Sequence, residues 1–261
     1  MVSTDVARNA IGIIGNIISL FLFLSPLPTF IQIVKKGSVE QFSPVPYLAT
    51  LINCMVWVLY GLPMVHPDST LVITINGTGT AIEIVFLILF IIYSDKKGRN
   101  KVLLIILVEV IFIAVLAVLV LTLVHGTKKR TLVVGIVCIL FNIMMYASPL
   151  SVMKMVITTK SVEYMPLSIS LASFANGLAW GIYALLRFDA FILAPNGSGT
   201  VLALAQLILY ATYYKSTQRQ IAARQSQGKG EVGLTGVVVD CNSKSNRGGS
   251  HHSRGPVANG A

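Results

Sequence analysis

Two short motifs place a side-chain amide at the outer part of, or inside, a long apolar run. Residues 76–80 read NGTGT and residues 196–200 read NGSGT. An amide moved into hydrocarbon without a partner costs roughly 2–7 kcal/mol, so Asn76 and Asn196 must each find a partner. That partner could be a ligand rich in hydroxyl groups, or a facing helix joined by an interhelical hydrogen bond. The spacing alone leaves both interpretations open.

Trp57 and Trp180 are the only tryptophans in the chain. In membrane proteins tryptophan most often sits in the belts at the membrane surface. Each of these two, however, lies about ten residues into an apolar run, near mid-depth. Flat apolar faces above and below a ring, with amides at its edge, form a chemically sensible carbohydrate site.

Prolines fall at comparable places in the two halves of the chain. Pro26 and Pro149 lie well inside apolar runs, whereas Pro46 and Pro166 stand at the starts of later runs. A proline inside a helix removes one backbone hydrogen bond and costs about 3 kcal/mol, but one in the first turn is easily tolerated. The inner pair therefore predicts kinks, which are common in membrane helices and need no function by themselves.

Few side chains could support catalysis or proton transfer. Glu83 and Glu109 are acids inside apolar runs, where an ionisable residue is a functional candidate by default. Glu83 follows Asn76 by seven residues, two helical turns along the same face, so proton coupling must be considered. No Lys, Arg or His accompanies either acid within the runs, which favours a structural role. The spans hold no Ser/His/Asp, metal-ligand or paired-carboxylate pattern, so we expect neither an enzyme nor a cofactor.

The composition indicates the elements that must position these residues. Of 261 residues, 54% are hydrophobic and 11% are charged, whereas a soluble domain usually has about 25% charged residues. A span of the bilayer takes about 20 apolar residues in a helix. The sequence therefore predicts an all-α membrane protein with seven transmembrane helices, over residues 10–32, 46–65, 70–93, 102–124, 131–155, 167–186 and 192–214.

The net charge of +10 is concentrated at one end of the chain. Residues 215–261 hold seven Lys and Arg against two acids, are rich in Ser, Gly and Gln, and lack apolar periodicity, so we expect a disordered tail. No compact basic domain indicates nucleic-acid binding. Lys and Arg number 15 on the side of the tail and 5 on the other, which predicts a cytoplasmic C-terminus and an outside N-terminus.

An internal repeat relates the two halves. A shift of 123 residues places Ser25-Pro26-Leu27 on Ser148-Pro149-Leu150, as well as Asn53 on Asn176, Trp57 on Trp180 and Tyr60 on Tyr183; a shift of 120 aligns the two NG motifs. Three helices end on the opposite side of the membrane, so one more helix is needed to make the second copy parallel to the first. We therefore predict a first repeat at 1–93, a linker helix within 94–130, a second repeat at 131–214 and the tail at 215–261, with a site between the two halves.

The motifs LSPLPTF, SVEQFSPVPY, INGTGT, YASPLSVMKMVITTKSVEYMPL and PNGSGT together resemble the plant SWEET (MtN3/saliva) sugar transporters, over about residues 8–215. Among these the chain is most similar to the hexose-associated subgroup. The resemblance implies a bidirectional uniporter for a small sugar in the plasma membrane, with the vacuolar membrane as the alternative. It also implies assembly with copies of itself or other SWEET chains.

The resemblance further assigns roles to single residues. It implies sugar contacts for Asn76, Asn196 and Trp180; the family varies at Trp57. It also implies hinges at the proline tetrad, Pro26, Pro46, Pro149 and Pro166. Finally, it implies an outer gate that is closed by a hydrogen bond between Tyr60 and Asp189. Without the resemblance, Tyr60 and Asp189 would be an interfacial tyrosine and a solvated loop aspartate. The tetrad departs from strict symmetry, because the shift of 123 pairs Pro46 with Ile169 and Pro166 with Ser43.

Two other classes of membrane protein compete. A proton-coupled amino-acid or cystine transporter of the related PQ-loop group would carry a titratable acid in its symmetric motifs, which here hold Pro-Leu and Asn-Gly. A seven-helix receptor would not be expected to repeat, and helix 70–93 ends IIYSD, without an acidic-Arg-Tyr signature. A retinal protein would need a lysine within 192–214, and none occurs there.

Overall fold

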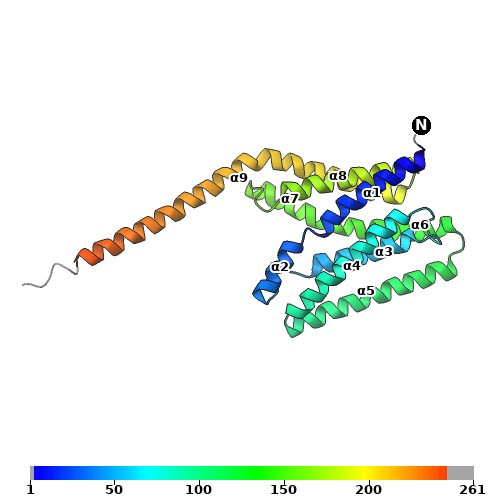
Figure 1. Cartoon of the computed structure of the whole chain (residues 1–261), viewed down its shortest axis with the longest axis horizontal. Coiled ribbons are helices and arrows are strands. Elements are labelled where there is room, and N and C mark those ends of the chain that lie inside the picture. The colour runs from blue at the N-terminus through cyan, green and yellow to red at the C-terminus, as the bar shows by residue number, and fades with distance from the viewer. Residues whose placement is uncertain (1–2, 246–261) are drawn as a thin grey trace, which may run out of the picture.

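A computed structural model describes residues 3–245, with side chains assigned as far as residue 226. Every regular element in this part of the chain is a helix (Figure 1). The helices are α1 (Thr4–Phe23), α2 (Leu27–Lys36), α3 (Val45–Gly61), α4 (Thr70–Tyr93), α5 (Lys96–Leu123), α6 (Thr127–Met145), α7 (Ala147–Thr159), α8 (Leu167–Leu186) and α9 (Ala190–Ser245).

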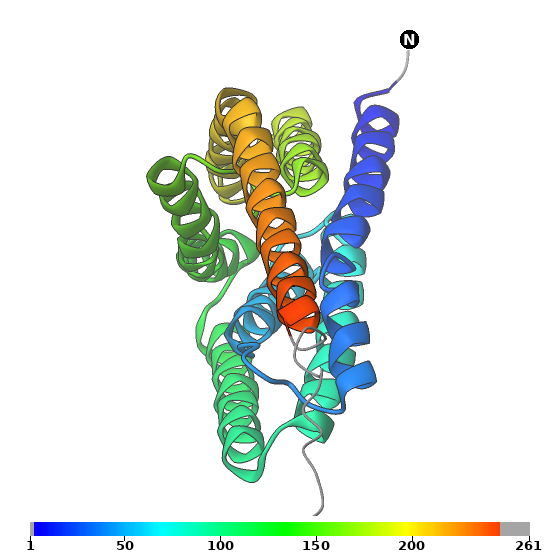
Figure 2. The same cartoon turned by 90° about the vertical axis from the view of Figure 1, so that its left-hand side faces the viewer.

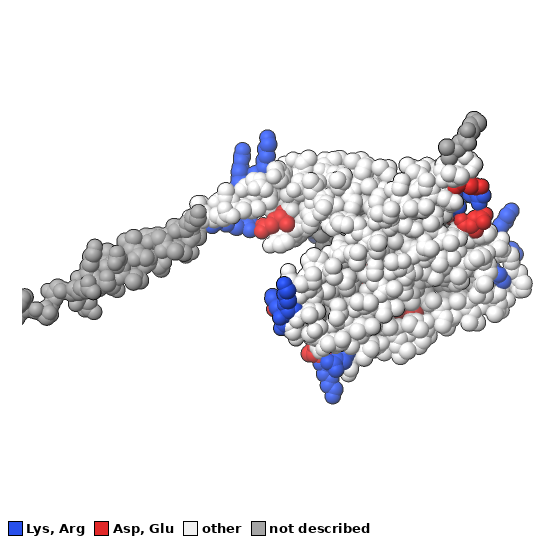
Figure 3. Space-filling model, viewed as in Figure 1, with Lys and Arg blue, Asp and Glu red and all other residues white. Residues whose placement is uncertain are grey.

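The apolar helices confirm the predicted membrane architecture. Six helical segments in the described residues are long and apolar enough to cross a bilayer, and the shorter apolar helix α3 supplies the seventh span. Lys, Arg, Asp and Glu gather mainly at the two ends of the face shown in Figure 3, and the broad belt between them shows other residues apart from one small acidic spot. This separation matches a bilayer that excludes charge from its hydrocarbon core.

The first span of each repeat is broken into two helices instead of running straight through. α1 ends at Phe23 and α2 begins at Leu27, with Pro26 in the turn between them. The corresponding break separates α6 from α7 at Tyr146, and Pro149 lies in the first turn of α7. A proline lacks the N–H needed to continue the preceding helix but fits the first turn of a new one, so each break falls beside its proline.

Helix contacts follow the repeat. The third helix of each repeat packs against the first and second, as α4 does on α1 and α3 and α9 does on α6 and α8. The two repeats meet through α1 on α8 and α3 on α6, so the first helix of each repeat contacts the second helix of the other. This reciprocal pairing gives the two parallel repeats a pseudo-twofold relation.

The linker helix α5 lies at the edge of the bundle. It contacts α3, α4 and α6, and both Figure 1 and Figure 2 show it on the opposite side from α8 and α9. Most of its large apolar side chains are exposed, which suits a helix that faces lipid. These contacts agree with the predicted role of a connector that reverses the direction of the chain between repeats.

The predicted start of a disordered tail at residue 215 is wrong for the described part of that segment, because α9 continues as a helix to Ser245. Thr217 is buried, and its Oγ1 accepts a 2.8 Å hydrogen bond from the backbone N–H of Val162 in the α7–α8 loop. Gln220 donates to two carbonyls at the end of α7, and Arg224 forms a 3.0 Å ion pair with Glu163. Polar contacts of this kind leave no apolar periodicity in the sequence. Residues 246–261 lie outside the described residues.

These contacts predict that two truncations will differ in stability. Ending the chain after Lys215 removes Thr217 and leaves the Val162 N–H without its partner, which costs about 1–3 kcal/mol. Ending it after Ser226 keeps every contact of α9 with the α7–α8 loop described above. We expect the shorter protein to melt several degrees lower in detergent (about 2–4 °C per kcal/mol for a chain of this size), with Thr217→Val reproducing part of the loss. Equal melting temperatures of the two truncations would contradict this account.

Candidate functional site

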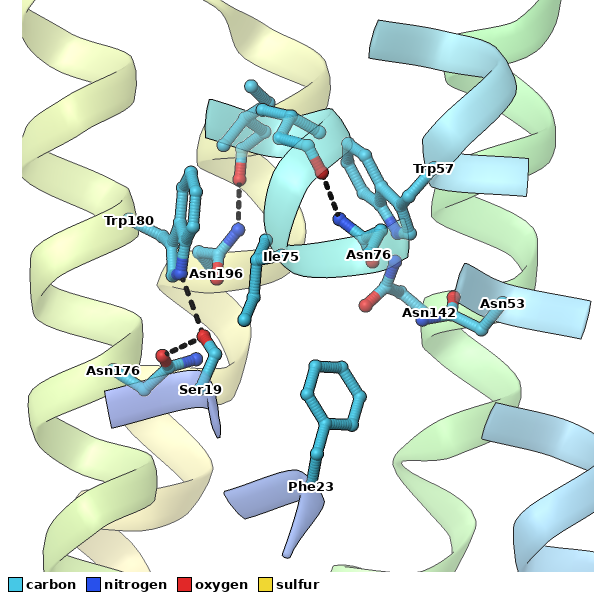
Figure 4. Close-up of a pocket in the computed structure, with 12 residues that line it drawn as sticks. Ser19, Phe23, Asn53, Trp57, Ile75, Asn76, Asn142, Asn176, Trp180 and Asn196 are labelled. Atoms are coloured by element: carbon cyan, nitrogen blue, oxygen red, sulfur yellow. Dashed lines mark hydrogen bonds between the residues drawn. The ribbon is translucent and has the colours of Figure 1, made fainter. Parts of the chain in front are cut away.

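A cavity of about 140 Å³ lies between the two repeats, near the middle of the bundle. All four residues predicted to contact a ligand, Asn76, Asn196, Trp57 and Trp180, line it (Figure 4). None of the remaining lining residues is charged: they are Ser19, Phe23, Asn53, Val72, Ile75, Asn142, Asn176 and Ile192.

The lining repeats itself across the pseudo-twofold axis. The shift of 123 residues that relates Trp57 to Trp180 also relates Asn53 to Asn176 and Ser19 to Asn142, and the shift of 120 relates Asn76 to Asn196 and Val72 to Ile192. Ten of the twelve lining residues are therefore five pairs of equivalent positions. A cavity built in this way presents similar chemistry from both halves to a single ligand.

The two motif asparagines have the same local geometry. Asn76 Nδ2 donates to the carbonyl of Val72 at 2.9 Å, and Asn196 Nδ2 donates to the carbonyl of Ile192 at 2.8 Å, one turn back in the same helix. Neither amide forms a hydrogen bond to a different helix within the described part of the chain. The interhelical alternative is therefore not what this structure shows. Each side-chain carbonyl oxygen is left as an acceptor on a cavity-lining residue.

The tryptophans are held edge-on by tyrosines one turn away. Trp57 meets Tyr60 with ring centroids 5.3 Å apart, and Trp180 meets Tyr183 at 5.2 Å, both in the T-shaped arrangement that aromatic rings favour. Both indoles are buried, so they belong to the interior and not to an interfacial belt. Gly15 of α1 allows α8 to come close, since a Cβ at that position would lie 3.1 Å from the Trp180 ring.

Sequence reasoning missed four polar residues of the cavity: Ser19, Asn53, Asn142 and Asn176. Asn53 and Asn176 are matched by the repeat, and a matched amide inside two apolar runs could have identified them, as it did for the NG motifs. Ser19 and Asn142 differ in type, so the repeat gives no signal for them. Only the packing of α1 and α6 brings these two to the cavity.

One end of the cavity is closed by a hydrogen bond between the repeats. The Tyr60 hydroxyl lies 2.9 and 2.8 Å from the two carboxylate oxygens of Asp189, and both side chains are buried. Asp189 also accepts from the backbone N–H groups of Phe191 and Ile192, which caps the start of α9 and holds the carboxylate in place. The hydrogen bond that the family resemblance implied is therefore present.

Charged and aromatic side chains reinforce this closed end. His66 stacks on Tyr60, and its Nε2 lies 3.5 Å from Asp189 Oδ2; burial lowers the pKa of His66, which favours the neutral ring at pH 7. Arg187 of the α8–α9 loop binds Asp5 at 2.9 Å and Asp68 at 2.8 Å. The N-terminus, the α3–α4 loop and the α8–α9 loop are thus tied together outside the Tyr60–Asp189 bond.

The other end of the cavity continues into a second cavity of about 230 Å³. The two share Asn142, Asn176 and Asn196, and Pro149 of α7 lines the second one. The other tetrad prolines lie away from both cavities, at the α1–α2 turn (Pro26), in the first turn of α3 (Pro46) and at the start of α8 (Pro166). The central cavity is therefore closed toward Tyr60 and extended toward Pro149.

The two intramembrane acids lie apart from this site. Glu83 and Glu109 are buried, but neither lines the central or the second cavity. Each has one fully buried carboxylate oxygen that lacks a hydrogen-bond partner among the described residues. The described residues also contain no group of three or more His, Cys, Asp or Glu that could hold a metal ion. The cavity itself can offer amide hydrogen bonds and aromatic faces, and no charge.

Comparison with known proteins gives one consistent result. The family model described as "Sugar efflux transporter for intercellular exchange" matches residues 9–98 and again residues 132–218. The chain is 61% identical over 240 residues to the Bidirectional sugar transporter SWEET4 of Oryza sativa subsp. indica, covering 92% of this chain and 93% of that protein. It is 62% identical over 236 residues to the Bidirectional sugar transporter SWEET7 of Arabidopsis thaliana, covering 90% and 91%.

A solved structure of a eukaryotic SWEET transporter matches with a TM-score of 0.79 and 40% identity, over 81% of this chain and 99% of the other. The double match of the family model falls on the two three-helix repeats that enclose the cavity. Together with the high identity over most of the chain, these findings show that the chain belongs to the SWEET (MtN3/saliva) family.

Proposed function

We propose that this protein is a facilitative transporter, a uniporter that moves a small sugar in either direction across a membrane by alternating access. The observation that carries the proposal is the twofold-related cavity of amides and tryptophans between the repeats, closed at one end and extended at the other. The printed names of the relatives, bidirectional sugar transporters, support it. Resemblance to the hexose-associated subgroup suggests glucose or another hexose as the substrate.

The cavity chemistry suits a neutral, hydroxyl-rich ring. In the proposal, the side-chain oxygens of Asn76 and Asn196 accept hydrogen bonds from sugar hydroxyls, and each Nδ2, which uses one of its two hydrogens within the helix, keeps one N–H to donate. Trp57 and Trp180 supply apolar faces for the C–H surfaces of the ring. Removing water from uncharged amides when the sugar binds costs less free energy than removing it from charged side chains.

Tyr60 and Asp189 form the gate at the closed end of the proposed transporter, because their hydrogen bond must break before a sugar can pass. The tetrad Pro26, Pro46, Pro149 and Pro166 supplies hinges at helix junctions, where a change of helix direction breaks few backbone hydrogen bonds. The shape of the cavity supports a state open toward the Pro149 end.

The proposed orientation places the N-terminus and the Tyr60 end outside, with the C-terminus in the cytoplasm. In this orientation one basic cluster, residues 128–130 (KKR), falls on the outer side, although Lys and Arg usually gather on the cytoplasmic side. A structural role partly explains this exception. Arg130 donates to the carbonyls of Leu121, Val124 and Met64 at 2.9, 2.8 and 3.2 Å, so it caps the end of α5. Residence in the plasma membrane and assembly with other SWEET chains stay predictions.

The cavity lining favours a uniporter over a proton-coupled transporter of the PQ-loop group. Coupling needs a group that gains or loses a proton where the substrate binds, but the described lining of both cavities has no Asp, Glu, His, Lys or Arg. Glu83 and Glu109 lie elsewhere. A receptor is disfavoured by the repeat and by the cavity that repeat encloses.

The test is uptake of labelled glucose, fructose, galactose and sucrose by proteoliposomes, with and without a pH gradient. We expect a hexose to equilibrate across the membrane and its initial rate to be insensitive to collapse of the gradient. Flux that disappears when the gradient is collapsed would indicate proton coupling. Absence of flux for all four sugars in correctly folded protein would argue against the proposed substrate class.

Substituting the motif asparagines should weaken transport. Asn76→Ala and Asn196→Ala each remove an acceptor for a sugar hydroxyl, and loss of a buried hydrogen bond corresponds to about a 5- to 150-fold fall in affinity, or roughly 1–3 kcal/mol. The matched control is Asn16→Ala, which removes an amide that bonds Thr74 between α1 and α4 and does not line the central cavity. If both motif variants transport at the rate of the parent, or the control fails equally, these asparagines are not the binding groups.

Weakening the gate should shift the protein toward opening at the Tyr60 end. Tyr60→Phe keeps the edge-on contact with Trp57 but removes the bond to Asp189, whereas Tyr183→Phe makes the same change at the equivalent position, whose hydroxyl does not bond Asp189. A Val72→Cys reporter in the cavity wall should be alkylated faster by an impermeant maleimide from the outer side in Tyr60→Phe only. Unchanged alkylation in Tyr60→Phe would show that this bond does not control access.

A further inference from the structure

Ser19 links the two repeats at the wall of the cavity. It lies on α1, is 8% exposed, and its hydroxyl contacts two residues of α8 in the other repeat. Trp180 Nε1 lies 3.1 Å from Ser19 Oγ, and Ser19 Oγ lies 2.6 Å from Asn176 Oδ1 (Figure 4). Both partners line the central cavity, so the bonds join the site to the helix that packs against it.

The donor and acceptor roles in this chain of bonds follow from chemistry. An indole N–H can only donate, so Ser19 Oγ must accept from Trp180. The single hydroxyl hydrogen of Ser19 is then available for Asn176 Oδ1, which can only accept. With its Oδ1 bonded to Ser19, Asn176 has no hydrogen bond from Nδ2 to any described residue.

The twofold-related positions, Asn142 of the second repeat and Trp57 and Asn53 of the first, lack this arrangement. The repeat mate of Ser19 is Asn142, whose Nδ2 donates to the Cys138 carbonyl of its own helix at 3.1 Å. Trp57 Nε1, the mate of the Trp180 donor, makes no hydrogen bond to the described part of the protein. The two aromatic walls therefore differ: one indole N–H is bonded to protein, and the other is available within a cavity of amides.

Packing fixes the Trp180 ring in the same orientation. Gly15 lies one turn before Ser19 on α1, and a Cβ there would be only 3.1 Å from the indole, so α1 closes directly over the ring. Tyr183 meets the ring edge-on at 5.2 Å. A ring held by a helix surface, an edge contact and a hydrogen bond has little freedom to rotate.

We infer that Ser19 is a positioning residue of the proposed sugar site: it holds Trp180 as a fixed stacking wall, turns the Asn176 amide N–H groups toward the ligand, and so makes one side of a twofold cavity different from the other. Trp180 then offers the sugar only its face, while Trp57 can also donate from its N–H. This difference favours one orientation of an asymmetric ring over its twofold-related alternative. The inference rests on the proposed function for its ligand and on geometry for the positioning itself.

Fluorescence can test the positioning directly, because the chain has only two tryptophans. In a Trp57→Phe background, Trp180 is the sole indole. We expect Ser19→Ala to shift its emission maximum and raise its quenching by acrylamide. Ser19→Thr, which keeps the hydroxyl, should stay near the parent, as should Ser168→Ala, the matched control at an exposed position of α8.

Transport by Ser19 variants of the otherwise unchanged chain supplies the functional measurement. For glucose we expect Ser19→Ala to raise KM about five- to tenfold, the change typical of one lost hydrogen bond, with the maximal rate nearly unchanged and Ser19→Thr restoring most of the loss. Folded Ser19→Ala with the emission and quenching of the parent would overturn the inference, as would normal KM despite altered emission. A shift in emission in a protein that neither binds nor moves any sugar would instead support the positioning and refute the proposed function.

Discussion

The constraint behind this structure is that a polar group within the bilayer must be satisfied by the protein itself or face a cavity. Asn76 and Asn196 meet it by each donating one amide hydrogen to a carbonyl of its own helix, which leaves the second N–H and the side-chain oxygen for the cavity. An amide arranged in this way needs no partner on another helix. The two repeats can therefore separate and approach again without breaking a bond that either motif requires.

Symmetry supplies the cavity, and departures from symmetry give it direction. The amides and tryptophans recur in both repeats, but the closing bond does not: Tyr60 meets Asp189, and the repeat mate Tyr183 packs beneath Arg8 instead. The shift of 123 residues places His66 opposite Asp189, and these two mates lie 3.5 Å apart at the closed end. A strictly twofold chain would have no reason to place an acid on one side only. The residues that break the twofold symmetry lie at the closed end of the cavity, where Tyr60 meets Asp189, and at Ser19.

The sequence was sufficient for the features that periodicity and repetition encode. Hydropathy located the seven spans, and matched residues located both motif asparagines and both tryptophans in one cavity. It did not reveal that Thr217 extends the last helix onto the α7–α8 loop, because one hydroxyl bound to a backbone N–H has no periodic signature. Nor could it find Ser19 and Asn142, which differ in type and reach the site only through helix packing. Contacts between distant segments are what a single sequence encodes least directly.

The broken first helices explain how such a bundle could move at one end only. The proline breaks divide each first span into a half that contacts both repeats and a half that contacts, among the described residues, only its own repeat. α1 contacts α8 as well as α4, and α6 contacts α3 as well as α9, whereas α2 contacts α4 and α7 contacts α9. For opening and closing at the Pro149 end of the proposed transporter, α2 and α7 can tilt with their own repeats while the α1–α8 and α6–α3 interfaces stay packed. The Gly15–Trp180 contact lies in the retained interface. The wall of the site can therefore keep its shape while access to it changes.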